Sequence, residues 1–410
     1  MISVITPTHN PRFLSETHAA LKEQTRKDWE WVLVPNGPAL GVEFPKGRKV
    51  RVVPYEGVPN IGAIKRFAFD QARGDILVEL DHDDLLRPDA LERISEALAG
   101  ADFCYSDCTE FIDQTWAPHT YDSRWGWESR EVKYKGHPLK AMVSWKPIPA
   151  SICYVWWAPN HVRAWTREGY EKAGKHDPLM PVGDDHDLVT RTYLSGRMQR
   201  IDKDIYLQRM YPESATKQFN AQIQAATKNT YARSIDAIVR RGCELEGLPC
   251  FDLGGAHNPA EGWTPIDLAL GGPDLRGRWP WDDSTVGAFR AFDFLEHLPD
   301  KMHTLSEIHR CLVPGGWLLS CTPSALGRGA FQDPSHCSYW VRDSFRYVTE
   351  TGLAKYIGNE TIRFQAMRLH ENEPYEIVDG KVRQPDRVPY VTADLVALKD
   401  GYSGPGQVLI

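Results

Sequence analysis

Three aspartates and a histidine follow directly behind the apolar run ILVEL (76–80), giving the stretch ELDHDDLL at residues 79–86. Two carboxylates two residues apart in an extended segment can bind one hard cation together, and Mg²⁺ or Mn²⁺ commonly bridges such carboxylates to substrate phosphates. We therefore interpret Asp81 and Asp83 as candidate metal ligands. Acidic residues also suit the start of the next predicted helix, where they cap it and complement its dipole. Asp84 is expected to be that cap.

A second acidic group lies in PVGDDHDLVTRTYLSG (181–196), again just before a predicted helix. On its own this group equally describes an acidic helix start. A glycine-rich turn between two predicted strands occurs in PCFDLGGAHNPAEGWTPIDLAL (249–270). Glycines there allow close backbone approach, and an acid after the second strand can hold ribose hydroxyls, as in nucleoside cofactor sites.

The elements around the first acidic cluster alternate between strand and helix patterns. We expect strands at 2–8, 29–37, 49–55 and 75–80, with helices at 13–24 and 60–74. Such alternation predicts a parallel sheet with helices on both faces. Ligands bind beyond the carboxyl ends of the strands in such sheets, and the cluster at 81–84 occupies that kind of position.

The chain length predicts two domains, because 410 residues exceed one ordinary core. Residues 111–180 are rich in Trp, Tyr, Pro and His and are expected to form binding loops. Within them, Trp156 or Trp157 is expected to stack on a sugar ring, and the alternative is that they pack in the core. A long polar helix is expected over 214–247. The predicted organisation is a first domain at 1–217, a helical linker at 218–247, a second domain at 248–400 and a tail at 401–410.

Composition restricts the class of protein further. The chain is 42% hydrophobic and 25% charged, which is typical of a soluble globular protein. Its formal net charge of −7 gives no general basic footprint for nucleic acid. No apolar run approaches a membrane span, and the start MISVITPTHNP does not read as a secretory signal. Eight scattered cysteines without a CxxC pair favour a cytoplasmic location with reduced thiols.

The ordered motifs of residues 1–217 resemble those of inverting, family-2-type glycosyltransferases with the GT-A fold. The resemblance rests on SVITPTHN, VLVPNG, the helix NIGAIKRFAF, the DxD in ELDHDD, and GDDHDL, followed by LQRMYPESAT (207–216). It implies an α/β fold with a Rossmann-like nucleotide-sugar-binding sheet. It also implies a nucleotide-sugar donor, bound Mn²⁺ or Mg²⁺, and an acceptor hydroxyl.

The same resemblance implies roles for individual residues. Asp81 and Asp83 would hold the metal–diphosphate, and Asp185 would be the general base, its pKa raised by burial and by the neighbouring Asp184 and Asp187. The remaining donor contacts fall into two groups: a nucleotide pocket lined by Thr6, Pro7, Thr8 and Asn36, and diphosphate contacts from Lys65, Arg66 and Arg209. Lys65 and Arg66 are equally well explained as solvated helix residues.

Two departures from the family pattern bear on the donor. The turn after the second strand, VPNG, offers Pro35 and Asn36 where an acid usually contacts the nucleobase, so the base is left open. Tyr211 stands where a histidine is common in the closing segment, so a metal or phosphate contact there is lost or changed.

Residues 248–400 resemble class I S-adenosylmethionine-dependent methyltransferases. The resemblance rests on CFDLGG, AFDFLEHLPD, CLVPGGWLLS and DPSHCSYW (333–340). It implies a second Rossmann-like sheet with S-adenosylmethionine as cofactor and adenine held near 278–285. The implied residues are Asp252, Gly254 and Gly255 at the cofactor turn, Asp267 on the ribose, Glu296 at the transfer site, and His297 as catalytic base with His336 as the other candidate.

This half also departs from its pattern, since Ala256 replaces the last glycine and the gap between Asp252 and Asp267 leaves little room for a first helix. The leading expectation is a bifunctional enzyme that transfers a sugar and methylates the glycan product. The alternatives are a glycosyltransferase with a catalytically inactive, acceptor-binding second half, and a non-catalytic carbohydrate-binding protein. The acceptor would be a glycan, a lipid-linked molecule or a protein. The acidic charge disfavours a hydroxylated DNA base, and the sequence leaves the oligomeric state open.

Overall fold

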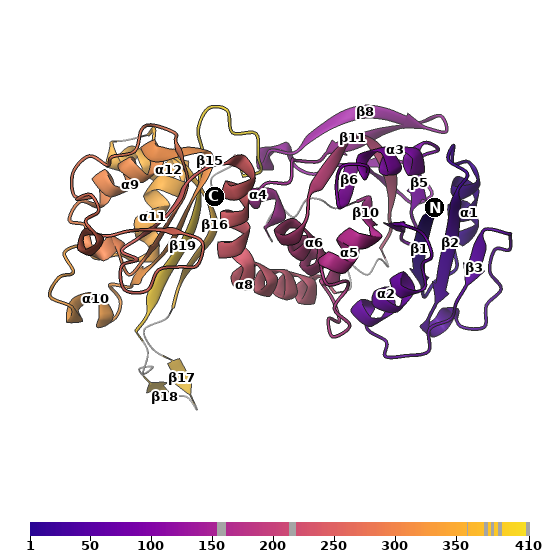
Figure 1. Ribbon diagram of the computed structural model, residues 1–410, viewed down its shortest axis with the longest axis horizontal. Coiled ribbons are helices and arrows are strands. Elements are labelled where there is room, and N and C mark those ends of the chain that lie inside the picture. Colours follow the sequence, from indigo (N-terminus) through magenta and orange to yellow (C-terminus); the bar gives the residue numbers. More distant parts are fainter. Residues whose placement is uncertain are drawn as a thin grey trace. The chain divides into compact units, whose positions relative to one another are not determined.

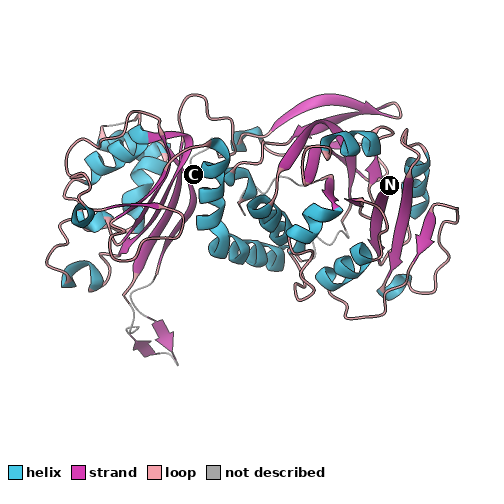
Figure 2. Cartoon of the chain, viewed as in Figure 1, coloured by secondary structure: helices cyan, strands magenta, loops and turns pink. Residues whose placement is uncertain are grey.

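The computed structural model describes residues 1–153, 161–212, 219–358, 360–372, 376–378, 381–383 and 388–406. The chain divides into two compact units, Met1–Ile238 and Val239–Ile410, each with its own sheet and helices (Figures 1 and 2). The boundary falls within helix α8 (Asn220–Glu246), which corresponds to the helix expected over 214–247. Within the described residues, no helix combines the length and the apolar character needed to cross a membrane.

The first unit is built on a mixed sheet with the strand order β3-β2-β1-β4-β10-β6-β11-β5. The first four strands are parallel, as expected, but β10 runs antiparallel to both β4 and β6. The smaller strands β7, β8 and β9 extend the sheet from β6. The strands are β1 (Ile2–Thr8), β2 (Trp29–Pro35), β3 (Val50–Val52), β4 (Ile76–Glu79), β5 (Leu85–Leu86), β6 (Phe103–Ile112), β7 (Pro118–His119), β8 (Glu128–Tyr134), β9 (His137–Val143), β10 (Arg163–Thr166) and β11 (Met198–Met210).

Helices cover both faces of this sheet because successive strand residues point to opposite sides. On one face, Ile2 and Val4 pack with apolar residues of α1 and α3. On the other face, Ile5 packs with residues of α2, α5 and α6. The prediction of an α/β sheet covered on both faces is therefore confirmed. The helices are α1 (Leu14–Lys22), η1 (Gly37–Ala39), α2 (Ile61–Asp70), α3 (Ala90–Ala97), η2 (Ser123–Trp125), α4 (Pro149–Ile152), α5 (Arg167–Lys172) and α6 (Asp184–Ser195).

The second unit contains a six-stranded sheet with the order β13-β12-β14-β15-β19-β16. All strands are parallel except β19, which lies antiparallel between β15 and β16. A two-stranded ribbon, β17–β18, is separate from it. The strands are β12 (Cys250–Leu253), β13 (Thr264–Ile266), β14 (Val286–Phe292), β15 (Leu312–Pro323), β16 (Phe364–Glu371), β17 (Glu376–Val378), β18 (Lys381–Arg383) and β19 (Tyr390–Ala397).

The connection from β12 to β13 forms no helix over residues 254–263, which agrees with the short gap seen in the sequence. Other helices still cover the sheet and bury an apolar core that includes Trp279, Phe289, Ile308 and Trp340. The helices are η3 (Leu268–Leu270), η4 (Leu295–His297), α9 (Lys301–Cys311), α10 (Gly329–Gln332), α11 (Arg342–Thr349), α12 (Thr351–Ala354) and η5 (Lys355–Ile357).

Candidate functional site

The acidic loop 81–84 lies between strand β4 and the short strand β5, which pairs antiparallel with β11. Asp84 is buried, and it accepts hydrogen bonds from the Tyr206 hydroxyl at 2.8 Å and the Arg209 amide at 2.7 Å. The expectation that Asp84 caps the next helix is therefore wrong. Strand β5 intervenes, and α3 begins at Ala90 with Asp89 at its N-cap position.

The other two aspartates of the loop have different surroundings. Asp83 accepts a 2.6 Å hydrogen bond from the Tyr211 hydroxyl. Asp81 lies with Asp84 and His161 in a group whose possible ligand atoms are all within 4.8 Å of one another. Burial is the largest cause that raises the pKa of Asp81, to about 6, and the nearby carboxylates Glu79 and Asp83 raise it further. Lys65 acts in the opposite direction. Among the described residues, the group of three possible cation ligands that contains Asp81 also contains Asp84 and His161, whereas the sequence predicted Asp81 with Asp83.

His161 was not singled out by the sequence, yet it borders this group. Its Nε2 lies 3.9 Å from an Asp81 oxygen, and its ring stacks on Tyr206 with ring centroids 4.5 Å apart. Arg163 approaches the same Nε2 at 3.1 Å, so this nitrogen accepts from the guanidinium and the imidazole is neutral. Burial, together with Arg163, lowers the pKa of His161 well below its ordinary value. Oxygen ligands from Asp81 and Asp84 fit a hard cation such as Mg²⁺ or Mn²⁺.

The second acidic group begins helix α6. The Asp185 carboxylate is 2.9 Å from the Arg163 guanidinium and remains partly exposed. Burial works to raise the pKa of Asp185, but Arg163 and Lys65 outweigh burial and lower it. The expectation of a raised pKa at Asp185 is therefore wrong, because the ion pair with Arg163 was not anticipated from the sequence. Asp187, expected to help raise it, instead pairs with Arg191 at 2.7 Å and with Arg233.

Asp184 carries the raised pKa. It is buried, and burial brings its pKa to about 6 against the pull of Lys65. The Lys65 ammonium lies 3.4 Å from Asp184 and 2.7 Å from Glu79. His176 Nε2, another residue that the sequence did not indicate, lies 3.7 Å from the same Asp184 oxygen. This buried network joins α2, β4 and α6.

The three basic residues expected at the diphosphate all have carboxylate partners within the protein. Lys65 is buried between Glu79 and Asp184, as described above. Arg66 pairs with Asp70 at 3.1 Å and donates to the His176 carbonyl. Arg209 pairs with Asp113 at 2.8 Å and Glu16 at 2.9 Å, and it lines a pocket of about 320 Å³ with them. Neutralisation of the diphosphate by these residues stays a prediction.

The residues expected to line the nucleotide pocket meet where β1 and β2 end. The backbone N–H of Asn36 donates to the Thr8 carbonyl at 2.9 Å, and this hydrogen bond joins the two strand ends. The Thr6 hydroxyl is buried and accepts from the Trp31 indole, and the Thr8 hydroxyl bonds within the turn at Asn10. Pro7 and Asn36 are partly exposed. Trp156 and Trp157 lie outside the described residues.

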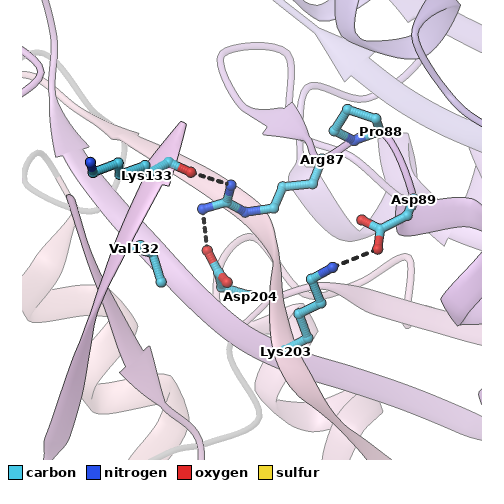
Figure 3. A pocket seen from close by; sticks show the side chains of 7 residues that line it. All are labelled: Arg87, Pro88, Asp89, Val132, Lys133, Lys203 and Asp204. Atoms are coloured by element: carbon cyan, nitrogen blue, oxygen red, sulfur yellow. Dashed lines mark hydrogen bonds and ion pairs between the residues drawn. The ribbon is translucent and has the colours of Figure 1, made fainter. Parts of the chain in front are cut away.

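A pocket of about 450 Å³ opens between β8, β11 and the segment that follows β5 (Figure 3). Arg87 lies across it, pairing with Asp204 and donating to the Lys133 carbonyl, while Lys203 pairs with Asp89 at 2.7 Å. None of the predicted site residues lines this pocket.

In the second unit, the predicted cofactor residues surround the end of β12. Gly254 has a φ of +78°, and a Cβ there would lie 2.9 Å from the Phe294 ring, so this turn requires glycine. A Cβ at Gly255 would lie 2.7 Å from an Asp252 oxygen. Asp252 is buried and paired with Arg290 at 2.8 Å. Asp267 caps η3 by accepting from the Ala269 amide at 2.8 Å.

Glu296 and His297 lie in η4, just after β14, and form a three-residue group with His336. Glu296 is buried, and it accepts a 2.7 Å hydrogen bond from the Thr322 hydroxyl. Burial raises the pKa of Glu296, although the hydrogen bonds partly oppose this. The structure thus brings together the predicted catalytic His297 and the other candidate, His336.

Comparison with known proteins relates one N-terminal segment of the chain to a family. Residues 3–148 match the family model described as glycosyl transferase family 2. This match includes the acidic loop and its strand, and it ends before Asp185. The second unit lies outside the family 2 segment.

Individual relatives are distant. The protein described as "Uncharacterized protein y4gI" of Sinorhizobium fredii (strain NBRC 101917 / NGR234) is 30% identical over 125 residues, which cover 28% of this chain and 14% of that protein. The match thus spans about one seventh of the length of that relative. S. aureus TarS 1-349 is 16% identical with a TM-score of 0.37, covering 57% of this chain and 72% of its own. The same protein in complex with UDP-GlcNAc is 14% identical with a TM-score of 0.40, covering 60% and 71%. Structural likeness at this level assigns no activity to this chain.

Proposed function

We propose that the first unit transfers a sugar from a nucleotide-sugar donor to an acceptor hydroxyl, with a divalent cation and with inversion at the anomeric carbon. One observation carries the proposal. The candidate cation ligands at the end of β4 are connected through His161 and Arg163 to Asp185 at the start of α6. These contacts link a candidate cation group to a partly exposed carboxylate. The family 2 match over residues 3–148 supports it.

The charge balance of this site supports a requirement for a cation. Two buried bases, Lys65 and Arg163, are surrounded by four carboxylates, which leaves two negative charges in excess. The four are Glu79, Asp81, Asp184 and Asp185. A nucleoside diphosphate brings further negative charge, so its binding beside these groups needs compensation. Asp81, with Asp83 or Asp84, would hold Mn²⁺ or Mg²⁺, which would supply this compensation and Lewis-acid assistance to the leaving diphosphate.

Asp185 is the proposed general base. Its carboxylate is partly exposed, so it can reach an acceptor hydroxyl, whereas Asp184 is buried. The Arg163 guanidinium keeps Asp185 deprotonated and fixes its orientation. In the proposed reaction Asp185 takes the proton of the acceptor hydroxyl as that oxygen attacks the anomeric carbon from the side opposite the diphosphate.

The donor base is left open in this proposal, because Pro35 and Asn36 provide no acid at the end of β2. The proposed acceptor is a glycan, a lipid-linked molecule or a protein.

Calorimetric titration with a panel of nucleoside diphosphates tests the first site. We expect one nucleotide to bind in the presence of Mn²⁺, and this binding to be lost when a chelator is added or when Asp81 is replaced in Asp81→Asn. Asp70→Asn serves as a control, because Asp70 lies on α2 within an exposed ion pair. Parallel titrations of Asp83→Asn and Asp84→Asn identify which neighbour completes the cation site. Metal-independent binding that survives Asp81→Asn, or no binding of any nucleotide to folded protein, would reject the proposal.

For the second unit we propose binding of S-adenosylmethionine and methylation of the glycan product. The supporting observations are the glycine-requiring turn after β12 and a parallel sheet in which only β19 is reversed. Its candidate residues are Asp252, Gly254 and Gly255 at the turn, Asp267 at the ribose, and His297 as base. A catalytically inactive module that binds the acceptor is the alternative.

A thermal shift assay separates these two readings. Stabilisation by S-adenosylmethionine and S-adenosylhomocysteine, followed by transfer of a labelled methyl group to the glycosylated product, is the expected result. No stabilisation of the folded chain by either compound would favour the acceptor-binding module.

A further inference from the structure

Glu296, His297 and His336 place one carboxylate and two imidazoles together in the second unit. One possible ligand atom from each residue lies within 4.8 Å of the others, and His336 Nε2 is 3.9 Å from Glu296 Oε1. The segment carrying His336 is fixed to η4 because the amides of Cys337 and Ser338 both donate to the Glu296 carbonyl, at 2.9 and 3.0 Å. The group is therefore positioned by backbone contacts as well as by side chains.

In both imidazoles a neighbouring hydrogen-bond acceptor shows that the proton is on Nδ1. His336 Nδ1 lies 3.0 Å from the Ala330 carbonyl, which can only accept, so this nitrogen donates. His297 Nδ1 lies 3.2 Å from the Ser335 hydroxyl, which gives its own proton to Asp333 at 2.6 Å and thus accepts from His297. In the neutral form each Nε2 then carries a lone pair. Holding the Nδ1 proton in this way orients metal-binding histidines.

Glu296 provides an independent observation at the same place. Its Oε2 accepts from Thr322, but its Oε1 is buried and accepts no hydrogen bond within the described part of the chain. A buried oxygen without a partner costs about 1–3 kcal/mol. The atom that lacks a partner is the one facing His336 Nε2, so a cation between them would satisfy both.

We propose that Glu296, His297 and His336 form a site for a divalent transition metal of the zinc class. Two imidazoles with one carboxylate suit Zn²⁺, Co²⁺ or Fe²⁺ better than Mg²⁺, which prefers oxygen ligands. Ligand atoms ~2.1 Å from a tetrahedral ion are about 3.4 Å apart. The 3.9 Å separation of Glu296 Oε1 and His336 Nε2 therefore needs a movement of only about half an ångström. Three protein ligands leave a position open for an oxygen of water or of an acceptor hydroxyl. With a metal bound, His297 would hold that ion, and the role of base proposed above for His297 would apply only to the metal-free site.

The site differs in chemistry from the group in the first unit. Asp81 and Asp84 offer oxygens, and the Nε2 of the adjacent His161 is occupied by Arg163. The two sites are therefore expected to select different ions, a hard cation in the first unit and a transition metal in the second.

Titration of the metal-free full chain with Co²⁺, followed by visible absorption and by metal analysis after gel filtration, tests the proposal. We expect wild type to gain a Co²⁺ spectrum that Zn²⁺ abolishes, and Asp81→Asn to keep it. His336→Asn and His297→Asn should each weaken Co²⁺ binding at least about 10–100-fold, the loss typical even for residues that only support a ligand. Far-ultraviolet circular dichroism verifies that both variants remain folded.

His303→Asn is the matched control. His303 lies on α9 in the same unit, and its Nε2 contacts the Gly277 carbonyl at 2.9 Å, away from the cluster. This variant should bind Co²⁺ as wild type does. Equal Co²⁺ affinity in wild type, His336→Asn and His297→Asn would overturn the proposal, as would a folded wild type that binds no Co²⁺ or a loss that depends on Asp81 or His303.

Discussion

Arg163 and Asp185 form an ion pair, 2.9 Å between the guanidinium nitrogen and the carboxylate oxygen, that joins β10 to the first turn of α6. Arg163 also contacts Glu79 at 3.6 Å and His161 at 3.1 Å, so one guanidinium connects the proposed base with the end of β4. Because Arg163 lowers the pKa of Asp185, the carboxylate is ready to accept a proton at neutral pH. The basicity that is lost by this pairing must be offset by close approach of the acceptor hydroxyl.

The first prediction concerns Asp185. Replacement by asparagine removes the proton acceptor while keeping the side-chain shape, so turnover with a nucleotide sugar should fall about 10²–10⁴-fold. Calorimetry should show nearly unchanged nucleotide affinity, since the cation group is not altered. Asp70→Asn, in an exposed pair on α2, should keep wild-type turnover. Retention of turnover in Asp185→Asn would show that another group removes the proton.

The second prediction separates two roles for Lys65. Lys65→Met removes the cation beside Asp184 and leaves Glu79 with Arg163 alone, 3.6 Å away, which should cost about 3–5 kcal/mol of unfolding free energy. Arg66→Met, one residue later in a half-exposed pair, should cost less than about 1 kcal/mol. Urea unfolding measures both. If Lys65→Met were as stable as wild type but bound nucleotide poorly, Lys65 would be a diphosphate ligand and its network would be secondary.

The third prediction concerns the pH dependence of stability through Asp184. Its pKa rises from 3.8 to about 6 on folding, so the fold favours the protonated carboxyl. The stabilisation is present below the unfolded pKa and is lost as pH rises through about 6. Asparagine does not titrate, so the stability of Asp184→Asn relative to wild type should increase between pH 4 and 7, by roughly 1–3 kcal/mol.

Asp185→Asn provides the control of opposite sign for that experiment. The folded pKa of Asp185 is lowered, so its contribution is present above pH 3.8 and is lost as pH falls further. Relative to wild type, Asp185→Asn should therefore gain stability only toward acidic pH. Parallel pH profiles of wild type and Asp184→Asn would contradict the raised pKa.

The fourth prediction tests the glycine turn of the second unit. Gly254→Ala forces a side chain into a left-handed position against Phe294, so it should lower stability and abolish the thermal shift produced by S-adenosylmethionine. Gly352→Ala is the matched control, because its Cβ meets nothing within 4 Å and it lies in helix α12. The control should keep the shift at equal or greater stability. An undiminished shift in Gly254→Ala would place the cofactor elsewhere.

The elements that carry the site were largely predictable from local sequence. Apolar runs ending in polar residues predicted β1, β2 and β4, and Asn60 begins α2 by accepting a hydrogen bond from the Ala63 amide. The loop 81–84 was placed correctly beyond a strand for the same reason. These features depend on residues close in sequence, where periodicity and capping act.

The partners inside the site were not predictable in the same way. Asp84 looked like a helix cap because the pairing of Leu85 and Leu86 with β11, more than a hundred residues later, leaves no local signal. Arg163 and His161 follow a stretch without periodicity, and Glu79 lies within an apolar strand pattern. Their ion pairs arise only when β10 inserts between β4 and β6. Lys65 was assigned to solvent or phosphate because its buried acids are distant in sequence.

Strand β11 provides Tyr206 and Arg209, and Tyr211 follows its last residue; the contacts of all three fix the acidic loop. The pairing of β11 with β6 shifts register between Ile201 and Tyr206. Beyond that irregularity the side chains alternate strictly between the two faces of the sheet. Lengthening or shortening the strand by one residue between Tyr206 and Arg209 would turn one of these two side chains to the opposite face. Homologues with the same chemistry should therefore conserve the spacing of these residues even where the residues themselves diverge. Variation in length should accumulate instead in the β8–β9 hairpin, because that hairpin takes part in none of these contacts with the acidic loop.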